Sequence, residues 1–337
     1  MYILGIESSC DETSAAVVSM EDGKREILSN IVASQIETHR LYGGVVPEIA
    51  SRAHIEAISN ITYEALAVAG LKIEDIGCIA VTSHPGLIGA LLVGVNFAKS
   101  LSFAYGIPLV AVNHVKAHVA AAYLEYPALE APFVSLVVSG GHTSFYNVTA
   151  PTDFVEIGGT RDDAAGEAFD KIGRVIGMPY PAGAAMDKLA YTGDSTAIKL
   201  PSPALLGDNA DFSFSGLKTA ALNYINSERQ KGVEPSAEDI TASYTKVIVD
   251  AIVKKTDYVI TKYSPKKLVL AGGVAANSHI RSALDELCEK RGVEFCRPSL
   301  SLCSDNAAMV AAAGYFEYLE GRFASTALNA SASDDGN

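Results

Sequence analysis

Apolar and polar positions alternate along this chain in short runs, and the runs predict strands between helices. Apolar stretches of four to seven residues predict buried strands. They cover residues 1–7, 15–20, 27–32, 79–82, 109–112, 133–138, 145–148, 267–271 and 294–297. Mixed segments predict helices over residues 47–60, 62–69, 91–103, 164–176, 185–191, 218–228, 236–263, 275–290 and 306–318. This alternation is typical of an α/β protein.

One pattern occurs twice. A strand, a small polar turn and a second strand occupy residues 3–18, and the same order returns at residues 133–148. A recurrence of this kind predicts a duplicated lobe. We expect a loop at residues 35–44, a turn at Asp22-Gly23 and a frayed tail over residues 324–337, because these segments are small, polar or rich in glycine.

Composition narrows the class of protein. The 337 residues are 49% hydrophobic and 19% charged, which allows a large core. A net charge of −13 argues against a protein that holds nucleic acid through its overall field, so RNA contact would need a local basic patch or a partner. Five cysteines without a C-x-x-C pair indicate reduced thiols.

The same features predict a soluble, cytoplasmic protein without a membrane segment. No Lys or Arg precedes Lys24, and acids come early, which does not fit a signal peptide. The longest apolar run, residues 87–98, is too short to span a bilayer.

Two histidines four apart are the most suggestive chemical feature. His114 and His118 precede the Ala-rich run 119–124, and on a helix they would share one face. Two imidazoles on one face can hold one cation, or they can be partly buried core residues. A zinc protease helix of this spacing has Glu after the first His, whereas this chain has Val115, so the general base of a peptidase is missing.

Two glycine turns follow apolar strands, at Gly140-Gly141 and Gly272-Gly273. Glycine lets backbone N–H groups approach a phosphate, although such turns also occur without ligands. We place the two turns in two half-domains, where they would favour a nucleotide site. Asn277 after the second turn either caps the next helix or faces a ribose or base.

Several acids have two interpretations each. Asp163, Glu167 and Asp170 form either a solvated helix face or a set that binds sugar hydroxyls or a bridging cation. Asp305 is either a helix cap or, if the fold brings it close, a third ligand for the histidines. Asp11 and Glu12 lie in the first hairpin turn, where they are either solvated or directed into a cleft.

Nine stretches stand out in order from Ile3 to about Ala313: GIESSCDETS, YGGVVPEIASRAH, PGLIGALLVG, NHVKAH, LVVSGGHTS, DDAAGEAFDK, DFSFSGLKT, LAGGVAAN and CSDNAAMVA. Taken together, they resemble the TsaD family, also called Gcp or YgjD, of bacterial tRNA N6-adenosine threonylcarbamoyltransferases.

The resemblance implies the two-lobe actin-like, sugar-kinase-like ATPase fold with duplicated ribonuclease-H-like lobes. The N-terminal lobe would comprise residues 1–113 and the returning segment 306–337, and the C-terminal lobe residues 114–305. The nucleotide and metal site would lie in the cleft between them.

The implied reaction transfers a threonylcarbamoyl group from threonylcarbamoyl-adenylate to N6 of the adenosine 3′ of the anticodon, in tRNAs that read codons starting with A. AMP is released.

The resemblance also implies roles for individual residues. Glu12 matches an acid thought to act in the transfer. His114, His118 and Asp305 match the ligands of one divalent metal, iron (Fe²⁺) or zinc. Matches to the substrate contacts are Val137, Val138, Ser139, Gly140, Gly141, Asp170, Gly183, Asp187 and Asn277.

The implied partners are tRNA, a TsaB-like paralogue, a TsaE-like ATPase and a separate synthase that supplies the adenylate. Candidate local RNA contacts are Lys254-Lys255, Lys262 and Lys266-Lys267, for which solvated helix faces are the simpler interpretation. The chain departs from the family at Ala182 and Ala184, where Gly-Gly-Pro is usual, and at Lys116-Ala117, where Glu-Gly is common. Rival functions are a small-molecule kinase of the same fold, a metalloprotease and a non-catalytic scaffold.

Overall fold

The computed structural model describes residues 1–21 and 23–334. The chain forms two compact units. The first contains Met1–Ala131, Ala150–Phe154 and Pro298–Asn337, and the second contains Pro132–Thr149 and Val155–Arg297.

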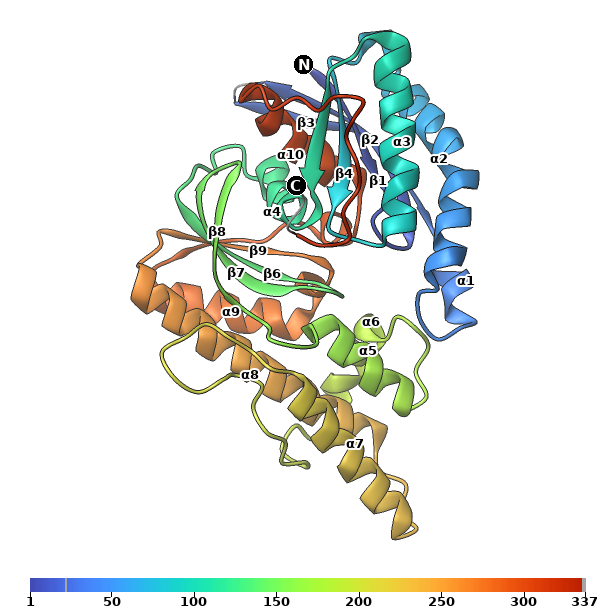
Figure 1. The fold of residues 1–337 in the computed structure, drawn as a ribbon. Helices are drawn as coiled ribbons and strands as arrows, with labels where there is room; N and C mark the ends of the chain where they lie inside the picture. Colours follow the sequence, from blue (N-terminus) through green and yellow to red (C-terminus); the bar gives the residue numbers. More distant parts are fainter. Residues whose placement is uncertain (22, 335–337) are drawn as a thin grey trace. The chain divides into compact units, whose positions relative to one another are not determined.

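The first unit is built on a five-stranded sheet in the order β3-β2-β1-β4-β5 (Figure 1). β1 pairs antiparallel with β2 and parallel with β4, and β4 pairs parallel with β5. Five of the six β1 residues are buried, because helices cover both faces of the sheet. The strands are β1 (Tyr2–Glu7), β2 (Glu12–Glu21), β3 (Lys24–Ser34), β4 (Cys78–His84) and β5 (Leu109–Asn113).

Helices pack on this sheet through their apolar residues. α2 and α3 contact β2 and β4, while α10 contacts β1, β4 and α4. α2 begins at Pro47, whose fixed φ suits a first helical position, and ends at Gly70 in the left-handed region. The helices are α1 (Ile36–Arg40), α2 (Pro47–Ala69), α3 (Ile88–Tyr105), α4 (His114–Glu125) and α10 (Ala307–Leu319).

The second unit repeats the sheet order of the first. Its strands run β8-β7-β6-β9-β10, so the first strand is again central, antiparallel to the second and parallel to the fourth. The predicted duplication is therefore visible in the topology. The strands are β6 (Phe133–Val138), β7 (Thr143–Ala150), β8 (Asp153–Gly159), β9 (Lys267–Ala271) and β10 (Glu294–Cys296).

The second unit also carries five α-helices within its described residues. α8 begins at the N-cap Ser236, whose hydroxyl accepts from the Asp239 amide, and it contacts α9. The helices are α5 (Ala165–Val175), α6 (Gly183–Leu189), α7 (Ser215–Gln230), α8 (Ala237–Tyr263) and α9 (Ser278–Arg291). Short 3₁₀ turns lie at Ala190–Thr192 and Gly273–Ala276 in this unit, and at Ile73–Asp75 and Leu300–Leu302 in the first unit.

Several local expectations need correction. The two helices expected over residues 47–69 are one helix, because no breaker lies between them. Strand β8 was not expected from the sequence, since its burial pattern is mixed rather than apolar. The segment expected as a loop at residues 35–44 contains α1. Of the expected turn at Asp22-Gly23, Asp22 lies outside the described residues.

The tail does not fray over its described part. The Ala324 amide donates to the Leu109 carbonyl at 2.8 Å, and the Ser331 amide donates to the Ser83 carbonyl at 2.9 Å. Residues 335–337 lie outside the described residues.

The expected lobe boundary directly before His114 differs from the compact units. α4 belongs to the first unit, because it packs on α10 and β3. All three residues of the predicted metal set therefore lie in that unit.

α3 is longer than the apolar run that predicted it. Within the described chain it is the one helix long and apolar enough to cross a membrane by length and composition alone. Its buried residues Val95 and Ala98 pack in the same core cluster as Val81 of β4.

A substitution at Gly5 tests the packing of α10 on β1. A Cβ at Gly5 would lie 2.1 Å from the Ala307 carbonyl oxygen, so Gly5→Ala forces the helix and the strand apart. We expect a loss of unfolding free energy on the order of 2 kcal/mol, measured by urea denaturation. The matched control is Gly216→Ala in α7, where nothing lies within 4 Å of the added carbon, and its stability should be unchanged or slightly higher. Equal losses in both variants would contradict this account of the packing.

Candidate metal centre and substrate loops

Helix starts place the three residues of the predicted metal set. Asn113 caps α4 by accepting from the Lys116 amide at 2.9 Å, which makes His114 the first helical residue and puts His118 one turn later. Asn306 caps α10 by accepting from the Met309 amide at 3.1 Å. The cap role considered for Asp305 therefore belongs to its neighbour.

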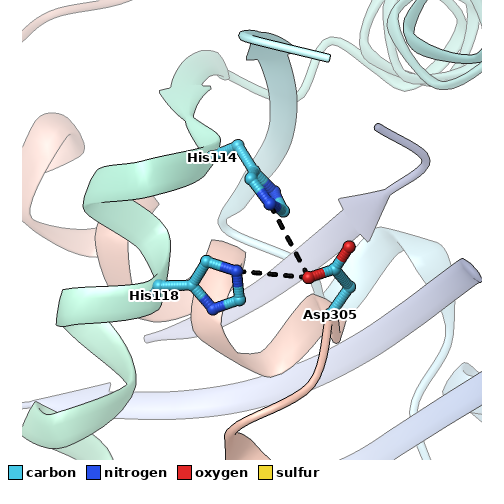
Figure 2. Close-up of side chains that lie close together, drawn as sticks. All are labelled: His114, His118 and Asp305. Atoms are coloured by element: carbon cyan, nitrogen blue, oxygen red, sulfur yellow. Dashed lines mark ion pairs between the residues drawn. The ribbon is translucent and has the colours of Figure 1, made fainter. Parts of the chain in front are cut away.

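The fold brings His114, His118 and Asp305 together. One ligand atom from each lies within 4.8 Å of the others, and within the described residues this is the one group of such side chains that meets the criterion. Asp305 Oδ1 lies 3.2 Å from His118 Nε2 and 3.6 Å from His114 Nε2 (Figure 2). The two imidazole rings meet edge to face with centroids 4.7 Å apart.

The contact of His118 with Asp305 is an ion pair without hydrogen-bond geometry. It is 1% exposed, and neither ring nitrogen has a hydrogen-bond partner within the described residues. A core histidine is normally satisfied by hydrogen bonds, because an unpaired buried polar atom is costly. Two imidazoles and one carboxylate are a donor set that suits Zn²⁺ or Fe²⁺. The residues present therefore fit a divalent transition metal.

A fourth residue, Glu7, joins this cluster and was not predicted. It ends β1 and is 0% exposed, and its Oε2 lies 3.1 Å from His114 Nδ1. Burial alone would raise the pKa of Glu7, but His114 beside it lowers the pKa. Burial would lower the pKa of His114, but the charges of Asp305 and Glu7 outweigh it and raise the pKa to about 9. The sequence signal was an acid at the end of an apolar strand.

The first turn is more buried than a solvated hairpin turn. Asp11 is 7% exposed, so the solvated interpretation is wrong for it, and Glu12 is the first residue of β2. Burial, Asp305 and Asp11 raise the pKa of Glu12 to about 9.

Buried His54 holds this turn. Its Nε2 donates to the Cys10 carbonyl at 3.0 Å, and Thr13 Oγ1 donates to its Nδ1 at 2.7 Å. Burial lowers the pKa of His54, so the neutral ring that makes both bonds is favoured.

The two glycine turns lie in one unit rather than in two half-domains. They follow β6 and β9, which are parallel neighbours in the second sheet. A Cβ at Gly272 would lie 2.5 Å from the Val138 carbonyl oxygen, so the turns are in contact. Val137 and Val138 end β6, and the Ser139 amide donates to the His142 carbonyl at 2.7 Å.

Local packing does not require glycine at positions 140 and 141. Nothing lies within 4 Å of a Cβ built on either residue, and neither has a positive φ. By contrast, a Cβ on Gly166 of α5 would lie 2.6 Å from the Ser139 carbonyl oxygen. The loop is therefore packed from the α5 side, while its two glycines leave backbone accessible to a ligand.

The remaining predicted substrate residues connect α5, α6 and α9. Asp170 Oδ1 accepts from the Ala182 amide at 2.7 Å, just before Gly183 opens α6. Asp187 Oδ1 accepts from the Ser278 amide at 2.9 Å. Asn277 Oδ1 accepts from the Ile280 amide at 3.0 Å, which confirms the capping interpretation. In each of Asp170, Asp187 and Asn277, one side-chain oxygen accepts a hydrogen bond from a backbone amide and so supports the fold.

Lysines satisfy two of the acids near α5. Asp163 lies 3.0 Å from Lys171 and 2.9 Å from Lys218, and Lys171 lies 2.6 Å from Glu167. The bridging cation considered for these two acids is therefore an ammonium group. Burial would raise the pKa of Asp163, but the two lysines outweigh it and hold the pKa below its usual value.

One candidate RNA contact is excluded by burial. Lys255 is 3% exposed, and its Nζ donates to the Asn209 carbonyl at 2.9 Å and also to the Leu205 carbonyl. This lysine fastens the loop over residues 205–209 onto α8.

The ion pairs of Asp163 with Lys171 and Lys218 should stabilise the protein in a pH-dependent way. The pKa of the Asp163 carboxyl is lowered in the folded state. Its ion pairs with the two lysines therefore add to the free energy of unfolding above pH 3.8, the usual pKa, and this stabilisation is lost as the pH falls further. We expect Asp163→Asn to reduce the free energy of unfolding at pH 7 by about 1 kcal/mol, with a smaller difference near pH 3. Urea denaturation at both pH values measures it. The control Asp250→Asn removes the exposed Lys246 pair on α8 and should cost less. An undiminished effect at pH 3 would contradict the assignment.

Comparison with solved structures identifies the fold. HypF in its phosphate- and nucleotide-bound form aligns with a TM-score of 0.61 and 15% identity, over 94% of this chain and 55% of that one. The component A of the Acidaminococcus fermentans (R)-2-hydroxyglutaryl-CoA dehydratase aligns with a TM-score of 0.55 and 18% identity, over 93% and 97%. These likenesses confirm the predicted actin-like, sugar-kinase-like fold.

Comparison of sequences identifies the family. The profile of TsaD, tRNA N6-adenosine threonylcarbamoyltransferase, matches residues 26–312. A protein of that name from Clostridium botulinum (strain 657 / Type Ba4) is 52% identical over 97% of this chain and 96% of its own length. One from Moorella thermoacetica is 51% identical over 97% and 95%. The predicted enzyme class is confirmed, and this chain belongs to the family of tRNA N6-adenosine threonylcarbamoyltransferases.

Proposed function

We propose that this protein transfers a threonylcarbamoyl group from threonylcarbamoyl-adenylate to N6 of the adenosine 3′ of the anticodon, with one Fe²⁺ or Zn²⁺ held by His114, His118 and Asp305. The family membership supports the transfer to tRNA. The observation that carries the metal is the convergent donor set, in which both histidines are buried and Asp305 is partly exposed. Within the described residues, both nitrogens of His118 lack a hydrogen-bond partner.

The chemistry demands an activated acyl group. The adenine amine is a poor nucleophile, because its lone pair is delocalised into the ring. In the step, N6 attacks the carbamoyl carbon, the bond from that carbon to the phosphate oxygen breaks, AMP leaves, and N6 loses a proton. A bound divalent cation would supply Lewis-acid polarisation of an acyl or phosphate oxygen. Positioning of the two reactants supplies much of the remaining acceleration.

Glu12 is the acid of the first turn that we propose to act in the transfer. Burial, Asp305 and Asp11 raise its pKa to about 9, and a cation bound at Asp305 would lower it again. Its carboxyl would exchange a hydrogen bond or a proton with the reacting groups.

The second unit supplies the groups proposed for the nucleotide. Gly140 and Gly141 present backbone to a phosphate without a side chain in the way. Asp170, Asp187 and Asn277 carry carboxylate and amide groups of the kind that bind ribose hydroxyls and adenine. The short strand and loop of Val137, Val138 and Ser139 lead into this surface.

The net charge of −13 favours partners for RNA binding. We propose that tRNA is held by an assembly in the cytoplasm with a TsaB-like paralogue and a TsaE-like ATPase, and that a separate synthase supplies the adenylate. Lys254, Lys262, Lys266 and Lys267 remain candidate local contacts.

A reconstituted reaction tests the proposal. The purified protein, its partners, threonine, bicarbonate, ATP and unmodified tRNA are incubated, and tRNA nucleosides are analysed by mass spectrometry. We expect threonylcarbamoyladenosine with the wild type and little or none with His118→Ala, because the metal loses a ligand. The control His84→Ala lies outside the cluster and should keep activity.

Two results would count against this function. Full activity of His118→Ala would remove the metal from the proposal. Phosphorylation of a sugar by the purified protein, with no tRNA product, would favour the kinase alternative.

A further inference from the structure

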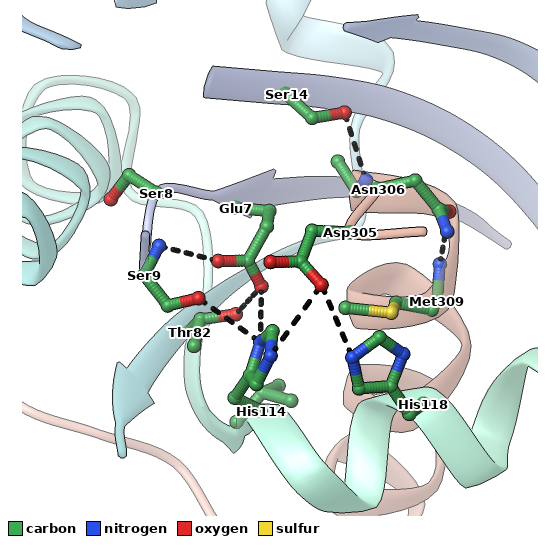
Figure 3. A network of polar contacts seen from close by, with 12 residues as sticks. Glu7, Ser8, Ser9, Ser14, Thr82, His114, His118, Asp305, Asn306 and Met309 are labelled. Carbon is green, nitrogen blue, oxygen red and sulfur yellow. Dashed lines mark hydrogen bonds and ion pairs between the residues drawn. The ribbon is translucent and has the colours of Figure 1, made fainter. Parts of the chain in front are cut away.

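The Glu7 carboxylate is enclosed by donors in the first unit. It is 0% exposed, and three groups from different segments approach it (Figure 3). The Ser9 amide donates to Oε1 at 2.5 Å, and Thr82 Oγ1 donates to Oε2 at 2.7 Å. His114 Nδ1 lies 3.1 Å from Oε2. A buried carboxylate is costly unless it is paired and hydrogen-bonded, so this arrangement holds Glu7 in one place.

The contact determines which nitrogen His114 offers. A carboxylate is an acceptor, so the Nδ1 beside it carries the proton and donates. The lone pair of the neutral ring is then on Nε2, the nitrogen that lies 3.6 Å from Asp305 Oδ1. Ser9 Oγ lies 3.1 Å from the same Nδ1 and adds a second restraint on the ring.

The two histidines therefore differ. Within the described residues no hydrogen bond restrains the ring of His118, whereas Glu7 and Ser9 restrain that of His114. Glu7 itself is outside the group of side chains whose ligand atoms converge. Its oxygens are directed to Ser9, Thr82 and His114, which does not fit a direct ligand.

We propose that Glu7 is a positioning residue, which fixes His114 in the Nδ1–H tautomer so that Nε2 binds the metal. Thr82 and the Ser9 amide keep the Glu7 carboxylate in the orientation that this requires. The inference rests on the proposed metal site and adds a residue that acts through His114. Outer partners of this kind typically contribute ten- to a hundredfold to metal affinity.

Metal affinity and the ring tautomer test the proposal. Zn²⁺ affinity of the metal-free full chain is measured by competition with a chromophoric chelator. Glu7→Gln should bind Zn²⁺ ten- to a hundredfold more weakly than the wild type. Two-bond ¹H–¹⁵N spectra of histidine-labelled, Zn²⁺-loaded protein should show His114 with a proton on Nδ1 and the metal on Nε2 in the wild type, and the loss of this pattern in Glu7→Gln. A merely structural role would not move this tautomer signal.

A control and a second variant keep the test decisive. Ser29→Ala removes a buried hydrogen bond to the Val17 amide in the same sheet without touching the cluster, and its affinity should match the wild type. If Glu7→Gln does not fold, Thr82→Val carries the test, since it removes one donor to Oε2 and should weaken binding severalfold. If the wild type binds Zn²⁺ tightly and the folded variants have the same affinity and the same His114 tautomer, this inference alone is overturned. No Zn²⁺ binding by the wild type overturns the metal site and this inference together.

Discussion

The structure of the first unit depends on a charge cluster at the end of its central strand. Glu7 ends β1, His114 begins α4, and Asp305 precedes α10, so one set of contacts connects three elements distant in sequence. Placing the buried Glu7 and the partly exposed Asp305 beside two imidazoles is favourable only when each charge has a partner. The raised pKa of His114 and the lowered pKa of Glu7 are two consequences of that pairing. An apolar core could have held these elements with less cost, which is why the cluster indicates function.

The duplicated topology serves two different chemistries. In the first unit, the hairpin after β1 carries acids, and the first turns of α4 carry two imidazoles. In the second unit, the corresponding strand β6 is followed by glycines, which leave backbone donors accessible. The same strand order thus presents side-chain ligands in one unit and main-chain groups in the other. This division would suit the metal and the nucleotide that we propose for the two units.

Many predicted site residues also support the fold. Asp187 and Asn277 determine where α9 begins, and Asp170 fastens the start of α6. A substitution at any of them would change helix positions as well as ligand contacts. Loss of activity alone therefore does not distinguish the two roles, which is why an isosteric change and a direct measure of ligand binding are the informative experiments for this protein.

The sequence by itself determined the alternation of strands and helices, the repeated hairpin and the spacing of His114 and His118. These follow from periodicity, which is local and is written in neighbouring residues. It also supplied the family through nine ordered stretches. It missed β8, whose alternation is weak, and it divided α2, since propensity alone does not reveal tertiary packing. Only the tertiary structure showed that Glu7 is part of the cluster, that both glycine turns lie on one sheet and that Lys255 is buried. Each of these depends on contacts between residues far apart in the chain, and no local pattern encodes such distances.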